Sequence, residues 1–222
     1  MIKKKAVIFD MDGLMIDSER VTWEGYQREC SLRGYEMTLD FYMQMLGHPM
    51  AAVRKMMQEH FGDSFPMEEI IHSVHHNMDL QFSTKGVPVK PGLMNLLKYT
   101  KEHGYRTMVA TSSDRDRVER ILKYAGIEEY FNDIICGNEV AQGKPNPDIF
   151  LKGCRKLAVE PEETYVVEDS EMGVLAAFRA GIDVICVPDM KEPEEEYREM
   201  TLCVVRSLTE AKDVIAARDS GN

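Results

Sequence analysis

Hydrophobic residues along the chain gather in short runs that alternate with longer amphipathic stretches. Several of the short runs are apolar at nearly every position, which is typical of parallel strands covered on both faces of a sheet. The predicted strands are Ala6–Asp10, Tyr105–Thr111, Asp133–Cys136, Thr164–Glu168, Asp183–Val187 and Leu202–Val205.

Between these runs, apolar residues recur with the spacing of a helix face. Gly126 and Gly181 lie just past two of these stretches and supply left-handed caps. Strand alternating with helix predicts an α/β fold with a doubly wound parallel sheet, whose ligand chemistry lies at the carboxyl ends of the strands. The predicted helices are Gly92–His103, Arg115–Ala125, Asp148–Leu157 and Met172–Ala180.

Residues 16–88 break this alternation, because helical patterns follow one another there with no strand signal among them. We therefore predict an α/β core made of residues 1–15 and 89–222, and an inserted all-helical cap domain, residues 16–88, that acts as a lid. The linkers at Met15–Asp17 and Gly86–Pro91 are the expected hinges, since glycine and proline mark turns there. The predicted cap helices are Ser18–Arg33, Thr38–Leu46, Met50–Phe61 and Pro66–Phe82.

The composition is that of an ordinary globular protein, with 222 residues, 44% hydrophobic and 29% charged. No window approaches the ~20 apolar residues that span a bilayer, so no membrane association is expected. The formal net charge of −11 argues against non-specific nucleic-acid binding, which needs a basic surface. Five scattered cysteines without CxxC spacing are typical of reduced thiols, so we expect a cytoplasmic protein, either a monomer or a weak dimer.

Asp10 and Asp12 lie two residues apart where the first predicted strand ends, and Gly13 follows at once. Two carboxylates so close repel each other and lose hydration, so the pair is destabilising unless a positive group compensates it. This stretch alone leaves two interpretations open. Either a cation binds here, or the pair is solvated in a turn.

Polar residues also follow other predicted strands. Thr111, Ser112 and Ser113 come after the second strand, where a hydroxyl can bind an anion or cap the next helix. Lys144 lies in the stiff, proline-rich stretch GKPNPDIF, which holds it at a defined loop position.

Glu168 and Asp169 end another buried strand, where they can bind a cation or complement a helix dipole. Strand ends of one parallel sheet converge on a single crevice, so these residues are expected near Asp10, Asp12 and Lys144. Several carboxylates with one lysine and a hydroxyl suit Mg²⁺ and a phosphate group.

Four motifs in order resemble those of the haloacid dehalogenase superfamily: DMDG, a hydroxyl after the second strand, KPNPDIF, and EDS with a downstream glycine. The resemblance covers nearly the whole chain. It is closest to the branch with a helical cap after the first motif, which holds β-phosphoglucomutase-like phosphatases and mutases. It implies a Mg²⁺-dependent phosphatase that acts on small, sugar-phosphate-like metabolites through an aspartyl-phosphate intermediate.

The resemblance also implies a role for each matching residue. Asp10 is the nucleophile, while Asp12 is the acid for the leaving alcohol and then the base for the incoming water. Thr111 hydrogen-bonds the phosphoryl group and Lys144 offsets negative charge. The implied metal ligands are Asp10, Asp12, Glu168 and Asp169, and the implied substrate contacts are Thr111, Ser112, Ser113, Lys144 and Gly47.

A phosphosugar mutase of the β-phosphoglucomutase type is the main alternative, because it shares these core motifs. Such mutases carry a histidine where this chain has Thr22, and an arginine near the position of Met50, so the cap favours a phosphatase. Asp12 argues against dehalogenation, because halide leaves without a proton. A non-enzymatic, phosphate-responsive protein is a third hypothesis; receiver domains combine similar residues, but they are about half this length.

His72, His75 and His76 have the i, i+3 and i+4 spacing of one helix face within the predicted cap. Two histidines four residues apart can share a Zn²⁺ ion. A solvated face is the preferred interpretation, and a contact between one of these histidines and the substrate is a third.

Overall fold

The computed structural model describes residues 2–48 and 50–221, which divide into two compact units. The first unit contains Met1–Asp17 and Pro88–Asn222, and the second contains Ser18–Val87. The first unit is built on a β-sheet. The described residues of the second form helices and turns only.

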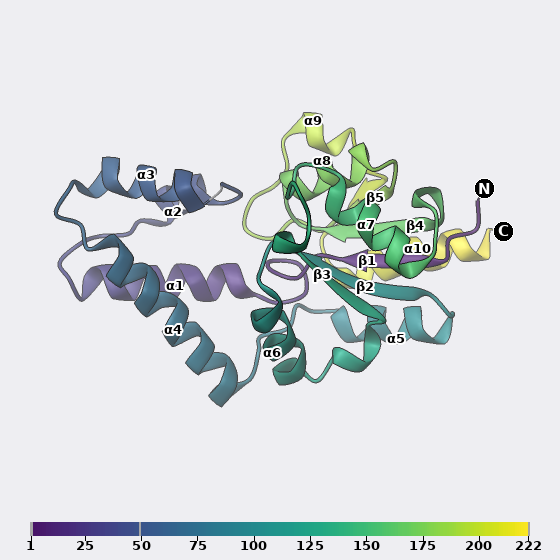
Figure 1. The fold of residues 1–222 in the computed structure, drawn as a ribbon, viewed down its shortest axis with the longest axis horizontal. Coiled ribbons are helices and arrows are strands. Elements are labelled where there is room, and N and C mark those ends of the chain that lie inside the picture. Colours follow the sequence, from purple (N-terminus) through teal and green to yellow (C-terminus); the bar gives the residue numbers. More distant parts are fainter. Residues whose placement is uncertain (1, 49, 222) are drawn as a thin grey trace. The chain divides into compact units, whose positions relative to one another are not determined.

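The sheet of the first unit has six strands, all parallel, in the order β3-β2-β1-β4-β5-β6. The chain starts in the middle of the sheet, builds one half and then crosses back to build the other, so the predicted doubly wound parallel sheet is confirmed (Figure 1). The strands are β1 (Ala6–Phe9), β2 (Arg106–Thr111), β3 (Asp133–Cys136), β4 (Thr164–Glu168), β5 (Asp183–Cys186) and β6 (Cys203–Val204).

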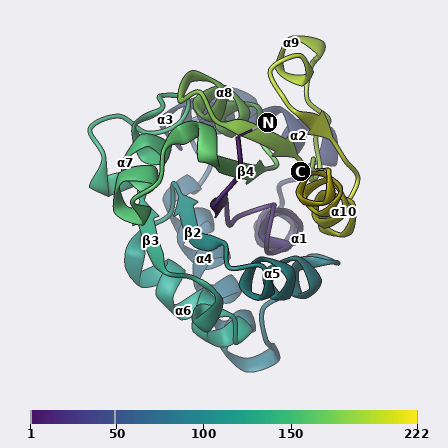
Figure 2. The same ribbon diagram turned by 90° about the vertical axis from the view of Figure 1, so that its right-hand side faces the viewer.

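Helices cover both faces of the sheet, as the alternation of strand and helix requires. One face packs against α7 and α8, and the other is covered by α5, α6 and α10, with α5 and α10 side by side (Figures 1 and 2). The bounds are α5 (Leu93–Glu102), α6 (Arg115–Ala125), α7 (Asp148–Leu157), α8 (Glu171–Arg179), α9 (Glu195–Arg198) and α10 (Leu208–Ser220).

The central strands β1 and β4 are buried on both faces, because alternate side chains point to opposite sides of the sheet. Ile8 and Val166 belong to the core that also contains Ile149 and Phe150 of α7. Phe9 of β1 is paired with Val109 on β2 and with Val167 on β4. This register brings the carboxyl ends of the three central strands to the same edge of the sheet.

The second unit consists of α1 (Ser18–Ser31), α2 (Leu39–Met45), α3 (Met50–Phe61) and α4 (Met67–Lys85). Helices α1 and α4 pack against each other along much of their length. Met57, Ile70, Val74 and Phe82 are buried, so apolar packing holds this unit together.

The structure differs from the predicted elements at a few ends. Helix α4 continues to Lys85, three residues past the predicted end, and stops where Gly86 adopts a positive φ of 88°. The last strand is shorter than predicted, and α10 was not predicted at all. Across residues 2–48 and 50–221, no helix is both long enough and apolar enough to cross a membrane.

Candidate active site

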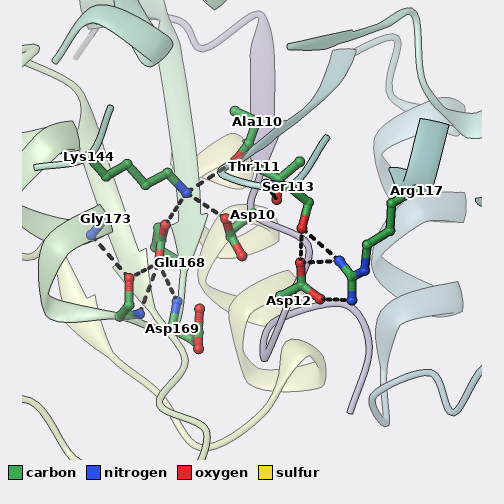
Figure 3. Close-up of polar contacts among 11 residues, drawn as sticks. Asp10, Asp12, Ala110, Thr111, Ser113, Arg117, Lys144, Glu168, Asp169 and Gly173 are labelled. Atoms are coloured by element: carbon green, nitrogen blue, oxygen red, sulfur yellow. Dashed lines mark hydrogen bonds and ion pairs between the residues drawn. The ribbon is translucent and has the colours of Figure 1, made fainter. Parts of the chain in front are cut away.

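Asp10 and Lys144 form the centre of a buried polar cluster at the carboxyl edge of the sheet (Figure 3). Asp10 directly follows β1, and its backbone N–H donates to the carbonyl of Val167 at 3.0 Å, which fixes it beside β4. Lys144 Nζ donates to Asp10 Oδ1 at 2.5 Å, to the Ala110 carbonyl at 3.1 Å and to Glu168 Oε1 at 2.6 Å. One ammonium group therefore ties together the ends of β1, β2 and β4.

Burial is the largest single influence on the pKa of each group in this pair, but its outcome differs between them. Burial raises the pKa of Asp10, although the nearby Lys144 opposes the shift. Burial alone would lower the pKa of Lys144, but the carboxylates of Asp10 and Glu168 outweigh it, and the net shift is upward. Lys144 therefore stays cationic next to a carboxyl group whose ionisation needs compensating charge.

Glu168 links Lys144 to the start of α8. Its Oε2 accepts from the backbone N–H groups of Asp169 and Ser170, each at 2.9 Å, and from Ser170 Oγ at 3.0 Å. Ser170 is also the N-cap of α8, since its Oγ accepts from the N–H of Gly173. One oxygen of Glu168 thus accepts from Lys144, and the other accepts from this loop.

Asp169 completes an acidic group with Asp10 and Glu168, in which one ligand oxygen from each lies within 4.8 Å of the others. Carboxylate oxygens so arranged could hold a hard divalent cation. Asp10 and Asp169 suit direct ligation better, because both oxygens of Glu168 accept hydrogen bonds, whereas Lys144 bonds Oδ1 of Asp10. Gly13 allows the close approach: it has a φ of 82°, and a Cβ there would lie 2.2 Å from Asp169 Oδ2.

Asp12 turns toward α6 and is not a member of this acidic group (Figure 3). Its carboxylate accepts from both Nη atoms of Arg117, at 2.7 and 2.8 Å, and from Ser113 Oγ at 2.8 Å. Arg117 is not among the site residues predicted from the sequence. Its only local signal is its position on the first turn of the helix that follows the hydroxyl cluster, four residues after Ser113.

The three hydroxyl residues after β2 have different surroundings. Thr111 is buried, and its Oγ1 accepts from the N–H of Ser113, while Ser112 is exposed. Gly47 lies after α2 in the second unit and has a φ of 77°. The structure thus brings Asp10, Lys144, Glu168 and Asp169 together. Their expected roles, and those of Gly47 and Ser112, stay predictions.

His72, His75 and His76 all lie on α4 with exposed side chains. The rings of His72 and His76 are parallel, with centroids 6.2 Å apart. Within the described ranges, the acidic group at the sheet edge is the one compact cluster of three or more possible metal ligands, and it contains no histidine. The zinc hypothesis therefore has no support from a third ligand.

Comparison with known proteins points to one family. A family model of haloacid dehalogenase-like hydrolases matches residues 7–187. A phosphorylated carbohydrates phosphatase from Thermotoga maritima is 34% identical over 182 residues, or 82% of this chain and 83% of that protein. A probable pseudouridine-5'-phosphatase from Drosophila melanogaster is 32% identical over 213 residues, covering 92% of this chain and 90% of its own.

Among solved structures, a candidate beta-phosphoglucomutase from Thermotoga maritima superimposes with a TM-score of 0.81. It is 29% identical, and the match covers 96% of this chain and 99% of that one. These findings confirm the family resemblance predicted from the four ordered motifs.

Proposed function

This chain belongs to the haloacid dehalogenase-like hydrolase family, and we propose that it is a Mg²⁺-dependent phosphatase of small phosphorylated metabolites. The two relatives described above are named for the removal of phosphate from phosphorylated carbohydrates and from pseudouridine 5'-phosphate. A sugar-phosphate-like ester is therefore the substrate class that we propose for this chain.

The observation that carries this proposal is the shared lysine. Lys144 Nζ lies within hydrogen-bond distance of both Asp10 and Glu168, in a site from which most solvent is excluded. A carboxylate that attacks a phosphate ester meets strong like-charge repulsion, so a buried cation beside the attacking oxygen is what such chemistry requires.

In the proposed reaction, Asp10 attacks phosphorus and forms an aspartyl-phosphate, which splits one difficult displacement into two steps. Asp12 donates a proton to the leaving oxygen and then accepts one from the water that hydrolyses the intermediate. The proposed substrate contacts are Thr111, Ser112, Ser113, Lys144 and Gly47.

The metal requirement belongs to the same proposal. Asp10 and Asp169 would hold Mg²⁺, with Glu168 as a further carboxylate close by, and the ion would neutralise charge on the phosphoryl group. The side chain of Asp12 faces Arg117, so any contact of Asp12 with the metal would come from its backbone.

Replacing Asp10 with asparagine tests the covalent mechanism. We expect Asp10→Asn to lower turnover by about a thousandfold or more, because the amide cannot form the acyl-phosphate. Phosphate release from a panel of phosphorylated metabolites, with and without Mg²⁺, is the measurement. Intact mass after an acid quench should show a phosphate adduct in the wild type alone.

Asp213→Asn is the matched control, because Asp213 is exposed on α10, where its Oδ1 lies 2.9 Å from Nζ of its neighbour Lys212. Circular dichroism should show that both variants fold. Turnover by Asp10→Asn at the wild-type rate would rule out the covalent route.

The mutase alternative has one observation in its favour, the structural likeness to the candidate beta-phosphoglucomutase. Thr22, at the position of the expected histidine, instead directs its hydroxyl to Met78 Sδ at 3.7 Å. An assay with β-glucose 1-phosphate separates the two functions. A phosphatase releases inorganic phosphate, whereas a mutase yields glucose 6-phosphate and is activated by a bisphosphate.

We further propose that the enzyme works in the cytoplasm as a monomer or weak dimer. Its five cysteines are free thiols in the structure, in agreement with a reducing compartment.

A further inference from the structure

Two residues beyond β2 hold the carboxylate of Asp12 by both of its oxygens (Figure 3). Arg117 Nη2 donates to Oδ1 at 2.8 Å, and Arg117 Nη1 donates to Oδ2 at 2.7 Å. Ser113 Oγ donates to Oδ2 at 2.8 Å and accepts from the same Nη1 at 2.6 Å. The three polar groups form a closed ring.

This arrangement restricts the orientation of Asp12 more than a single contact could. A planar guanidinium that meets both carboxylate oxygens fixes the plane of the carboxyl group as well as its distance. Both side chains are largely shielded from water, with 22% and 24% of their surface exposed, so solvent competes weakly for them.

Arg117 lies on a well-packed helix. Val118, Ile121 and Leu122 bury the inner face of α6, and Gly126 closes the helix with a left-handed cap. Asp12, by contrast, lies in the loop after β1. The helix therefore supplies a fixed reference for a side chain whose own segment is irregular.

We propose that Arg117 is a positioning residue that acts through Asp12, with Ser113 as its partner. It fixes the plane of the Asp12 carboxyl group, so that the proton for the leaving oxygen is carried on an oxygen lone pair that does not face Arg117 or Ser113. In the step that uses this proton, an oxygen of Asp10 forms a bond to phosphorus while the ester P–O bond breaks. The electron pair of the broken P–O bond stays on the leaving oxygen, which takes the proton from Asp12. This role rests on the phosphatase function proposed above.

The test uses the dependence on the leaving group. The ratio kcat/KM covers the steps up to the departure of the alcohol, so it excludes hydrolysis of the intermediate. An alkyl phosphate needs the proton from Asp12, whereas the nitrophenolate of p-nitrophenyl phosphate leaves readily without one. We expect Arg117→Ala to lower the alkyl-to-aryl ratio of kcat/KM about tenfold or more, because general acid catalysis is worth at least that much.

Companion variants show whether the effect passes through Asp12. Arg117→Lys keeps the charge but loses the bidentate contact, so its alkyl-to-aryl ratio should lie between those of the wild type and Arg117→Ala. Ser113→Ala should lower the ratio less than Arg117→Ala does. In an Asp12→Asn background, Arg117→Ala should cause no further fall. Lys123→Ala, which removes an exposed positive charge from the same helix, should leave the ratio unchanged.

Two results would overturn the proposal. Arg117→Ala could slow both esters equally, as a purely structural role predicts, or it could still lower the ratio without the Asp12 carboxyl, as a direct substrate contact predicts. Failure of the phosphatase function itself is seen separately, because the wild type would then release no phosphate from either ester.

Discussion

At the scale of single residues, the buried polar cluster around Asp10 and Lys144 depends on a glycine that has no functional group of its own. Gly173 lies in the first turn of α8, and a Cβ built there would lie 1.8 Å from Glu168 Oε1. The carboxyl group cannot simply move aside, because Lys144 and the α8 loop hold it from both oxygens. A methyl group added at Gly173 would therefore displace Glu168 and, through it, disturb Lys144.

We expect Gly173→Ala to lower the free energy of unfolding by about 1–3 kcal/mol, through the displaced Glu168 and its broken hydrogen bonds. Phosphatase turnover should fall with it, because Lys144 loses one of its anchors. Urea denaturation and steady-state kinetics measure the two effects. Gly143→Ala is the control, since a Cβ there meets no atom within 4 Å, and equal behaviour of both variants would contradict this account.

At the scale of elements, one acidic residue joins two helices of the second unit. Glu29 on α1 is buried; its Oε1 accepts from Asn77 Nδ2 on α4 at 2.9 Å, and its Oε2 accepts from Arg33 Nη1 at 2.8 Å. Burial by itself would raise the pKa of Glu29, but the hydrogen bonds from Arg33 and Arg28 outweigh it, and the pKa is lowered. The ionised form therefore stabilises the folded helix pair.

Because the folded pKa is lowered, this contribution is complete above the ordinary value of 4.5 and is lost as the pH falls through the folded value. At pH 7 we expect Glu29→Gln to lower the free energy of unfolding by about 1–3 kcal/mol. The difference from wild type should shrink in acid.

Trp23, the only tryptophan, lies on α1 and reports the unfolding of this unit by fluorescence. Glu24→Gln removes the same charge from an exposed position on the same helix and should have little effect. A Glu29→Gln difference that stays constant from neutral to acidic pH would show that the charge is not the cause.

The elements that could be predicted from the sequence are those with dense apolar runs and clear ends. Strand β4 and helix α6 match their predicted ranges, since a buried run or a capping glycine marks each boundary. Helix α10 was missed because its buried residues are few and include a small alanine. Its available signal is Ser207, whose hydroxyl accepts from the N–H of Glu210 as an N-cap.

The same contrast holds for the candidate site. Asp10, Lys144, Glu168 and Asp169 could be placed together because each lies at the carboxyl end of a strand or in the connection after it, and these ends share one edge of the parallel sheet. The pairing of Asp12 with Arg117 spans 105 positions and depends on how far one side chain reaches. No pattern along the chain specifies such a contact.

At the scale of the whole molecule, the two chain segments that connect the units are fastened to each other within the first unit. Asp17 N–H donates to the Pro88 carbonyl at 2.8 Å, and Lys90 N–H donates to the Met15 carbonyl at 2.9 Å. Lys90 Nζ also bonds Asp17, at 3.0 Å, and Asp189. These contacts predict that the two paired segments are stiff, whereas the sequence predicts hinges there.

Replacing Lys90 with methionine should loosen the pairing of these two segments. A charge-assisted hydrogen bond contributes about 1.5–3 kcal/mol, so we expect the amide hydrogens of Asp17 and Lys90 to exchange about tenfold faster or more. Hydrogen–deuterium exchange with mass spectrometry measures this. Lys85→Met, at an exposed position on α4, is the control, and unchanged protection at Asp17 in Lys90→Met would show that the backbone bonds suffice.

The chain leaves the sheet unit at Asp17 and returns to it at Pro88, side by side, which has a consequence for evolution and for protein engineering. Because the inserted helices leave and rejoin the sheet unit at adjacent points, their exchange for another insertion requires only that the newcomer's two ends lie equally close. Asp10, Lys144, Glu168 and Asp169 all come from outside the insertion. The insertion can thus be exchanged as a module without changing any of these four residues.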